Sequence, residues 1–136
     1  MQNRGLVEDH IRRAGSRLKA IAVLMKEKSW ADVVRECQEA VELTLKALLR
    51  EALIEVPRIH DVSAILLENR DRLPGRALAE VEFLARVSKA LRRDRELAFY
   101  GSEDLTPSDF YSEEDASQAF KDAQKVYEIV RESCSR

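Results

Sequence analysis

Turn-forming residues are scarce in this sequence, which has only four glycines and three prolines among 136 residues. A sheet protein needs frequent turns, so this scarcity argues against a strand-rich architecture. Charged residues make up 35% of the chain and hydrophobic residues 45%, a balance that suits amphipathic helices. We therefore expect an all-α protein, and the length predicts a single domain over residues 1–136 that can bury its own core.

Neither sign of charge is in excess, because 23 basic residues face 25 acidic ones and the formal net charge is −2. Proteins that coat duplex DNA neutralise many phosphates with a broad basic surface, so the charge balance argues against that class. Any contact with nucleic acid is therefore expected to be local.

Long apolar runs are missing as well. No stretch approaches the roughly 18 apolar residues of a membrane span, and the N-terminus has no apolar signal-peptide core. The two cysteines, Cys37 and Cys134, have neither metal-ligand nor disulfide-framework spacing, which fits a reducing compartment. We expect a soluble, cytoplasmic protein with no membrane contact.

The sequence offers no pattern of metal ligands. His10 has no second ligand four residues on, which leaves it as an exposed or helix-packed histidine. Glu39 and Glu42 share a helical segment, but no histidine follows either at the Glu-x-x-His spacing of di-iron bundles. We therefore predict no metal and no cofactor.

Apolar residues recur at three- and four-residue steps, the period of amphipathic helices. Ser29 with Asp32, and Ser112 with Asp115, have the spacing of capping boxes, which open helices. The pattern predicts long helices over residues 3–28, 30–52 and 76–99 and a last one from Ser112, a short helix over 62–69, and an exposed loop over 101–111. The short connections predict an antiparallel four-to-five-helix up-and-down bundle around the 30–52 helix.

His60 and Asp61 come shortly after Pro57, which ends the preceding helix. A histidine beside a carboxylate suggests an acid–base pair. The simpler interpretation is a histidine hydrogen-bonded in a turn, with Asp61 capping the next helix. We favour the second interpretation, because it needs only one partner and no serine or cysteine nucleophile.

The end of the 76–99 helix is the most charged part of the chain. It combines three arginines, two acids and two aromatic residues with a helix-stopping glycine: Arg92, Arg93, Arg95, Asp94, Glu96, Phe99, Tyr100 and Gly101. One interpretation is a solvated helix face with ion pairs between neighbours. The other is a site where guanidinium groups hold a phosphate and an aromatic ring stacks on a base.

Several segments together carry a resemblance to a known family. They are Trp30-Ala31-Asp32-Val33-Val34, Gln38-Glu39-Ala40-Val41-Glu42-Leu43, Leu45-Lys46-Ala47-Leu48-Leu49 and Val56-Pro57-Arg58-Ile59-His60-Asp61. In this order they resemble the core signature of HEPN domains (higher eukaryotes and prokaryotes nucleotide-binding). The resemblance covers nearly the whole chain, as far as the last helix.

The resemblance implies a dimeric helical bundle whose fourth helix ends in an arginine, four to six further residues and a histidine. In ribonuclease members, both subunits contribute this pair across the dimer cleft and cut RNA without a metal. In a related form a tyrosine follows the histidine, and small nucleotidyltransferases adenylylate that tyrosine in toxin pairs. On this chain Arg93 matches the arginine, Asp94 the polar residue that often follows it, and Tyr100 the tyrosine.

Ala98 stands where the family's histidine belongs, and no histidine lies between positions 97 and 103 to replace it. Alanine moves no proton, and a tyrosine with an ordinary pKa of about 10 is a poor base at neutral pH. We therefore expect a homodimeric module that binds a nucleotide, an RNA phosphate or a protein partner and has lost catalysis. Two alternatives stay open: a toxin ribonuclease that uses Arg93 and Tyr100 beside a partner nucleotidyltransferase, and a purely structural dimerisation module.

Helical spacing separates the arginines of this segment. Arg93 shares a face with Glu96 and Tyr100, three and seven residues on, whereas Arg92 and Arg95 lie together elsewhere. We therefore predict Arg93 and Tyr100 as the pocket pair. Glu96 offers Arg93 a competing role in a structural ion pair.

Overall fold

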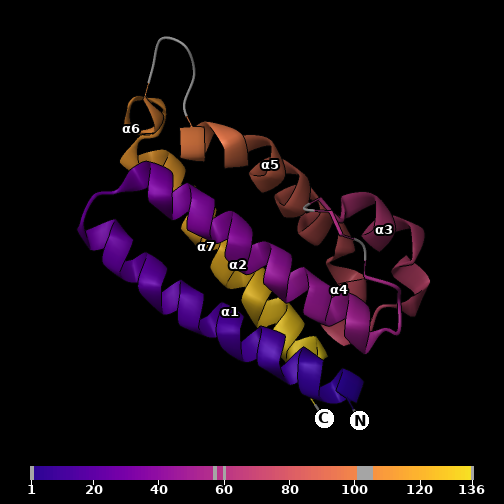
Figure 1. Cartoon of the computed structure of the whole chain (residues 1–136). Coiled ribbons are helices and arrows are strands. Elements are labelled where there is room, and N and C mark those ends of the chain that lie inside the picture. The colour runs from indigo at the N-terminus through magenta and orange to yellow at the C-terminus, as the bar shows by residue number, and fades with distance from the viewer. Residues whose placement is uncertain (1, 57, 60, 101–105, 136) are drawn as a thin grey trace.

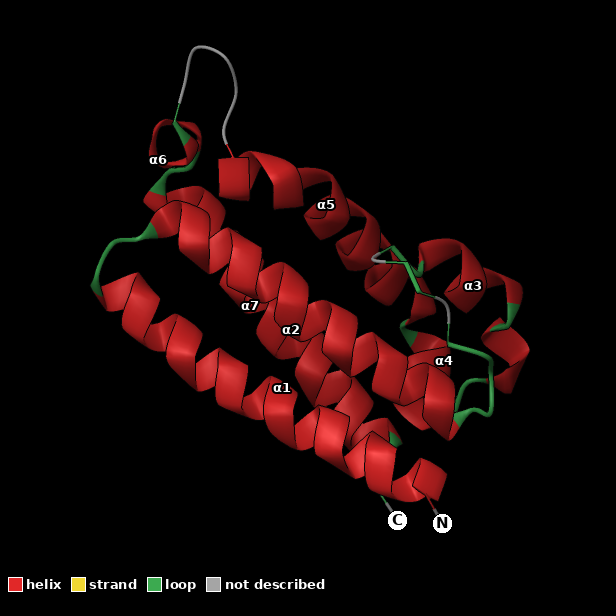
Figure 2. Cartoon of the chain, in the orientation of Figure 1, coloured by secondary structure: helices red, strands yellow, loops and turns green. Residues whose placement is uncertain are grey.

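Four long helices and several short ones make up the protein, and Figures 1 and 2 show their arrangement. This computed structural model describes residues 2–56, 58–59, 61–100 and 106–135, and only the backbone of residues 2 and 93–100. The elements are α1 (Gln2–Lys26), α2 (Trp30–Glu51), α3 (Ser63–Glu68), the 3-10 helix η1 (Arg70–Arg72), α4 (Gly75–Ala79), α5 (Val81–Tyr100), α6 (Pro107–Phe110) and α7 (Glu113–Ser133). No strand occurs within these described ranges, and the predicted all-α class is confirmed.

The helix α2 is the centre of the bundle. It packs against α1, α5 and α7, and Figure 1 shows it between α1 and α5. The side chains of Val33, Cys37 and Leu45 are fully buried along it. The N- and C-termini lie at the same end of the molecule in Figure 1, as an even number of long antiparallel helices requires. The predicted antiparallel bundle is thus confirmed, with α2 in the predicted central place.

The helix predicted over residues 76–99 is in fact two helices, α4 and α5, which separate at Glu80. Arg76 of α4 forms an ion pair with Glu132 of α7 at 3.0 Å, so α4 is tied to α7. In contrast, α5 packs mainly on α2. Leu78 lies in the part of the predicted helix that belongs to α4, and its side chain is 45% exposed.

Part of the predicted 101–111 loop is helical. The short helix α6 is opened by Thr106, whose N–H donates to the Asp109 carboxylate at 3.1 Å. Pro107 occupies the first turn, where its missing N–H costs nothing. The first five residues of the predicted loop lie outside the described residues. This Thr-Pro-x-Asp pattern is a helix-start signal that the sequence analysis missed.

The two predicted capping boxes have different outcomes. Ser112 accepts a hydrogen bond from the N–H of Asp115, whose carboxylate accepts one from the N–H of Ser112, so this box opens α7 as predicted. Ser29 instead donates its hydroxyl proton to the Asp32 carboxylate at 2.6 Å and makes no side-chain bond to the backbone of α2. The capping box predicted at Ser29 was therefore wrong.

Candidate functional site

The arginine-rich segment lies in the last turns of α5. The helix continues to Tyr100, directly before Gly101, which agrees with the end that the sequence predicts. The unbroken helix keeps Arg93 and Tyr100 seven residues apart on one face of the backbone. The side chains of Arg93, Asp94 and Tyr100 lie outside the described residues, and so does that of Ala98. Their predicted roles therefore stay predictions.

Arg92 is the one arginine of this segment whose side chain the structure describes. It is half-buried, and it makes no hydrogen bond or ion pair with the rest of the described chain. A guanidinium group carries five N–H donors and stays charged at any physiological pH. A cation whose donors meet no acceptor among the described side chains therefore stands at the predicted anion-binding end of α5.

A groove of about 450 Å³ runs beside α5, enclosed by α6 and α7. Its α5 wall consists of Val87, Ala90 and Leu91, and α6 and its C-cap contribute Phe110 and Tyr111. The two aromatic rings have centroids 6.4 Å apart and are tilted by 47°. Aromatic and apolar walls of this kind suit a planar ligand or an apolar side chain. We call this feature the α5–α7 groove.

Charged groups stand on both rims of the α5–α7 groove. Asp115 is held by the capping box of α7, and Asp122 accepts a hydrogen bond from Gln118 at 3.0 Å. Arg86 lies with its guanidinium carbon 5.2 Å from the centroid of the Phe83 ring and forms no ion pair in the described structure. The two acids are thus engaged locally, whereas the N–H donors of Arg86 can serve a ligand.

The turn before α3 is fixed by Asp61 and Ser88. The Asp61 carboxylate accepts bonds from the N–H of Ser63 at 2.9 Å and from the Ser88 hydroxyl at 3.3 Å. Ser88 is 3% exposed, so it is a structural residue and no nucleophile. His60 lies outside the described residues, and its predicted place in this turn stays a prediction. Asp61 binds the N–H of Ser63 at the start of α3, but the N-cap residue of α3 is Val62, so the capping role predicted for Asp61 was wrong by one residue.

The described chain holds no group of three or more His, Cys, Asp or Glu side chains close enough to bind a metal ion. Among the same residues, no helix is both long and apolar enough to cross a membrane. Cys37 and Cys134 are both buried, and neither forms a disulfide bond within the described part of the chain.

Comparison with known families decides the relationship that the sequence suggests. The HEPN domain family matches the chain over residues 7–133. The chain belongs to the HEPN domain family. No curated protein and no solved structure matches it. Membership agrees with the helical bundle and implies a function related to nucleotides or RNA in general.

Proposed function

We propose that this HEPN protein is a homodimeric module that binds a phosphate group of a nucleotide or RNA at the C-terminal end of α5, without cutting its ligand. Arg93, Asp94 and Tyr100 are the proposed binding residues. If the ligand is instead a protein partner, the same end of α5 would bind an acidic surface of that partner.

The proposal rests on the position of Arg86, which stands on the rim of the α5–α7 groove with no ion-pair partner in the described chain. Helical spacing puts Arg93 in the same row of α5, seven residues after Arg86. The groove also offers the rings of Phe110 and Tyr111. A row of guanidinium groups beside aromatic walls is suited to phosphate and base together.

Calorimetric titration with ATP, AMP and a short single-stranded RNA tests binding. Arg93→Ala should weaken it by about 1.5–3 kcal/mol, the worth of a hydrogen bond to a charged group. Arg92→Ala should cost less, since Arg92 lies about 100° around the helix from Arg93. Lys19→Ala is the control, because it removes one exposed positive charge from α1, away from the row of α5 that carries Arg86 and Arg93. Equal losses in the Arg93 and Lys19 variants would leave only diffuse electrostatics and contradict the proposal.

The proposed loss of catalysis rests on Ala98, which stands where the family motif has histidine. Without that proton-transfer group, the protein should leave single-stranded RNA intact, and Ala98→His is the variant to test for restored cleavage. Cleavage by the wild type that disappears in Arg93→Ala would favour the toxin ribonuclease instead. In that alternative, a partner nucleotidyltransferase would adenylylate Tyr100, which mass spectrometry of the co-expressed pair would detect.

The proposed homodimer brings two copies of the α5 end together. Sedimentation should show a dimer at roughly tens of micromolar protein, and a monomer there would contradict the assembly. A dimer that binds no nucleotide, RNA or acidic partner would favour the purely structural module.

A further inference from the structure

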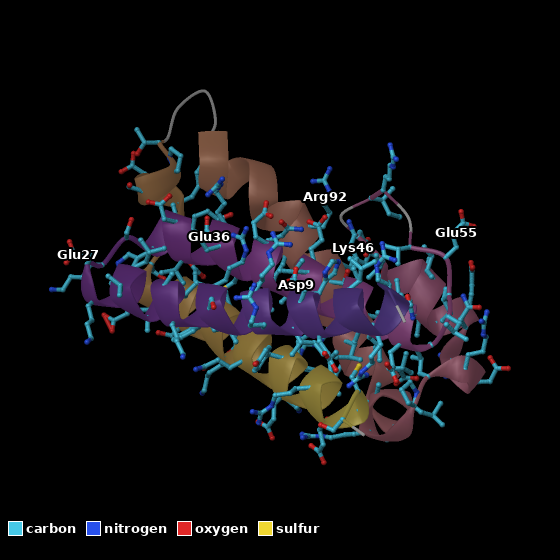
Figure 3. The ribbon with its side chains drawn as sticks, turned by 60° about the horizontal axis from the view of Figure 1, so that its bottom comes forward. Asp9, Glu27, Glu36, Lys46, Glu55 and Arg92 are labelled. Carbon is cyan, nitrogen blue, oxygen red and sulfur yellow. The ribbon has the colours of Figure 1, made fainter. Side chains whose placement is uncertain are left out.

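A second cluster of cations lies in a cleft between α1 and α2. The cleft encloses about 260 Å³. From α1 it is lined by His10, Arg13 and Arg17, which follow each other at three- and four-residue steps and so share one face. From α2 it is lined by Glu39, Glu42 and Lys46, and Leu43 completes it. Figure 3 views the molecule from the side of α1 and labels Lys46 on α2 and Asp9 beside this face of α1.

The ion pairs around the cleft leave its cations unequally neutralised. Lys46 is paired with Glu42 at 2.9 Å, and Arg17 with Glu36 at 3.1 Å. The ion pair described for Arg13 is the long one to the Asp9 carboxylate, at 3.8 Å. Asp9 is also bonded to Arg12 at 3.0 Å, so its charge is shared. Among the described ion pairs of the cleft, that of Arg13 is therefore the weakest, which leaves its guanidinium group the most available to a ligand.

One ring nitrogen of His10 in the cleft lacks a hydrogen-bond partner among the described residues. This atom, Nδ1, is buried. Such a buried polar atom is costly unless something binds it. Burial is the main cause that lowers the pKa of His10, and the positive charges of Arg50 and Arg13, and more weakly that of Lys46, lower it further against the opposing effect of Asp9.

The volume of the cleft and the charges around it limit which ligands it could bind. The cleft is smaller than the roughly 300–1,000 Å³ of pockets for drug-sized ligands, so a small group fits better than a whole cofactor. The positive charges of Arg50, Arg13 and Lys46 around His10 and the guanidinium donors of Arg13 favour an anion at this end of the cleft, and arginine binds phosphate oxygens with paired hydrogen bonds. A cation is disfavoured, and the described acids do not form a metal-binding group.

We propose that the cleft between α1 and α2 is a binding site for a phosphate-type oxyanion, held by Arg13 and Lys46 and in contact with His10. The oxyanion is either free phosphate or the phosphate group of a larger molecule. This site is separate from the proposed site at the end of α5 and does not depend on it.

The ring resonances of His10 provide the test, followed by NMR in the intact protein during titration with inorganic phosphate. The shift should saturate at millimolar phosphate, and bound anion should raise the pKa of His10 by stabilising its protonated form. Arg13→Gln should weaken the apparent affinity about tenfold. Lys19→Gln is the matched control: Lys19 is exposed on α1 nine residues after His10, half a turn around the helix, and should leave the affinity unchanged.

Sodium chloride at equal ionic strength separates binding from screening. If chloride reproduces the His10 shift, or if about 10 mM phosphate causes none, the site does not exist. Titration with AMP distinguishes the two sources of the oxyanion, since tighter binding of AMP than of phosphate identifies a phosphate ester. Arg93→Ala should leave the His10 response intact. Loss of the response in that variant would place the anion at α5 and overturn the second site.

Discussion

The hydroxyl of Ser88, buried in α5, accepts a hydrogen bond of 3.0 Å from the backbone N–H of Val62, the residue before α3. Val62 is itself fully buried, so this N–H has no access to solvent. The same hydroxyl donates to Asp61 at 3.3 Å. A single side chain of α5 therefore fixes the start of α3.

Ser88→Ala should lower the free energy of unfolding by about 1–3 kcal/mol, because it leaves the Val62 N–H buried without an acceptor. Urea unfolding measures the change. Ser16→Ala is the control, since the Ser16 hydroxyl bonds only the Arg12 carbonyl on an exposed face and its loss should stay within about 0.5 kcal/mol. Equal losses in the two variants would mean that the Ser88 bond contributes nothing specific.

The long helices could be predicted from the sequence because their apolar period persists over five or more turns. The helix predicted over 30–52 is observed as Trp30–Glu51, for example. The break at Glu80 could not be predicted, because glutamate favours helix and because α4 packs against α7 while α5 packs mainly on α2, a tertiary difference with no signal in the sequence.

The candidate site could be predicted only in part. The charged residues at the end of α5 follow one another along a single helix, so helical spacing predicts which of them share a face. The rings of Phe110 and Tyr111 reach the α5–α7 groove only because α6 packs against α5, a tertiary contact without a sequence period. That Arg86 has no ion-pair partner among the described residues likewise depends on which acids the fold brings near it.

The two cysteines should differ in how they become reactive. Burial, with smaller contributions from the charges of Glu36 and Asp122, raises the pKa of the Cys37 thiol to about 12. Cys134 is also buried, but it caps the C-terminal end of α7, where helices fray at low free-energy cost. We expect a thiol reagent to modify Cys134 first and Cys37 only on global unfolding. Mass spectrometry during labelling measures both rates, and equal rates would contradict the expectation.

The free energy of unfolding should rise with pH through the histidine range. Because the pKa of His10 is lowered below 6.5 in the folded protein, mainly by burial, protons bind more readily to the unfolded chain. The stabilisation is complete above about pH 6.5 and is lost as the pH falls from there to the lowered folded value. Urea unfolding at several values between about pH 8 and pH 5 should show that the free energy of unfolding changes less with pH in His10→Gln than in the wild type. An equal pH dependence of the free energy of unfolding in both proteins would mean that other titrating groups cause it.

Leu53 follows α2 in the left-handed conformation, with φ of 60°, and its side chain is 74% exposed. The turn is set by the N–H of Ile54, which donates to the Leu49 carbonyl at 2.9 Å. Glycine adopts this conformation without the penalty of a Cβ, so Leu53→Gly should stabilise the protein by about 0.5–1 kcal/mol. The control is Leu67→Gly inside α3, which should destabilise by about 1 kcal/mol in thermal or urea unfolding. Destabilisation by both changes would show that the Leu53 side chain contributes more than its backbone strain costs.

The closest approach of α1 to α7 that involves a glycine is at Gly15. A Cβ at this position would lie 2.8 Å from the Tyr127 hydroxyl oxygen and 3.3 Å from the ring carbon that bears it. Alanine favours helix over glycine by about 1 kcal/mol, but in the wild type this gain is offset by the displaced tyrosine. Tyr127→Phe removes the nearer of the two atoms and leaves a contact that a small shift of the ring can relieve.

We therefore expect Gly15→Ala to be neutral or destabilising in the wild type and stabilising in the Tyr127→Phe background, with a coupling of about 1 kcal/mol. Gly5→Ala is the control within the same helix, because its Cβ would meet nothing within 4 Å. That change should stabilise both backgrounds equally, by up to about 1 kcal/mol. Urea unfolding of the four Gly15 and Tyr127 combinations measures the coupling. Additive effects would mean that Tyr127 moves aside at no cost and that Gly15 is not required for the packing of α1 on α7.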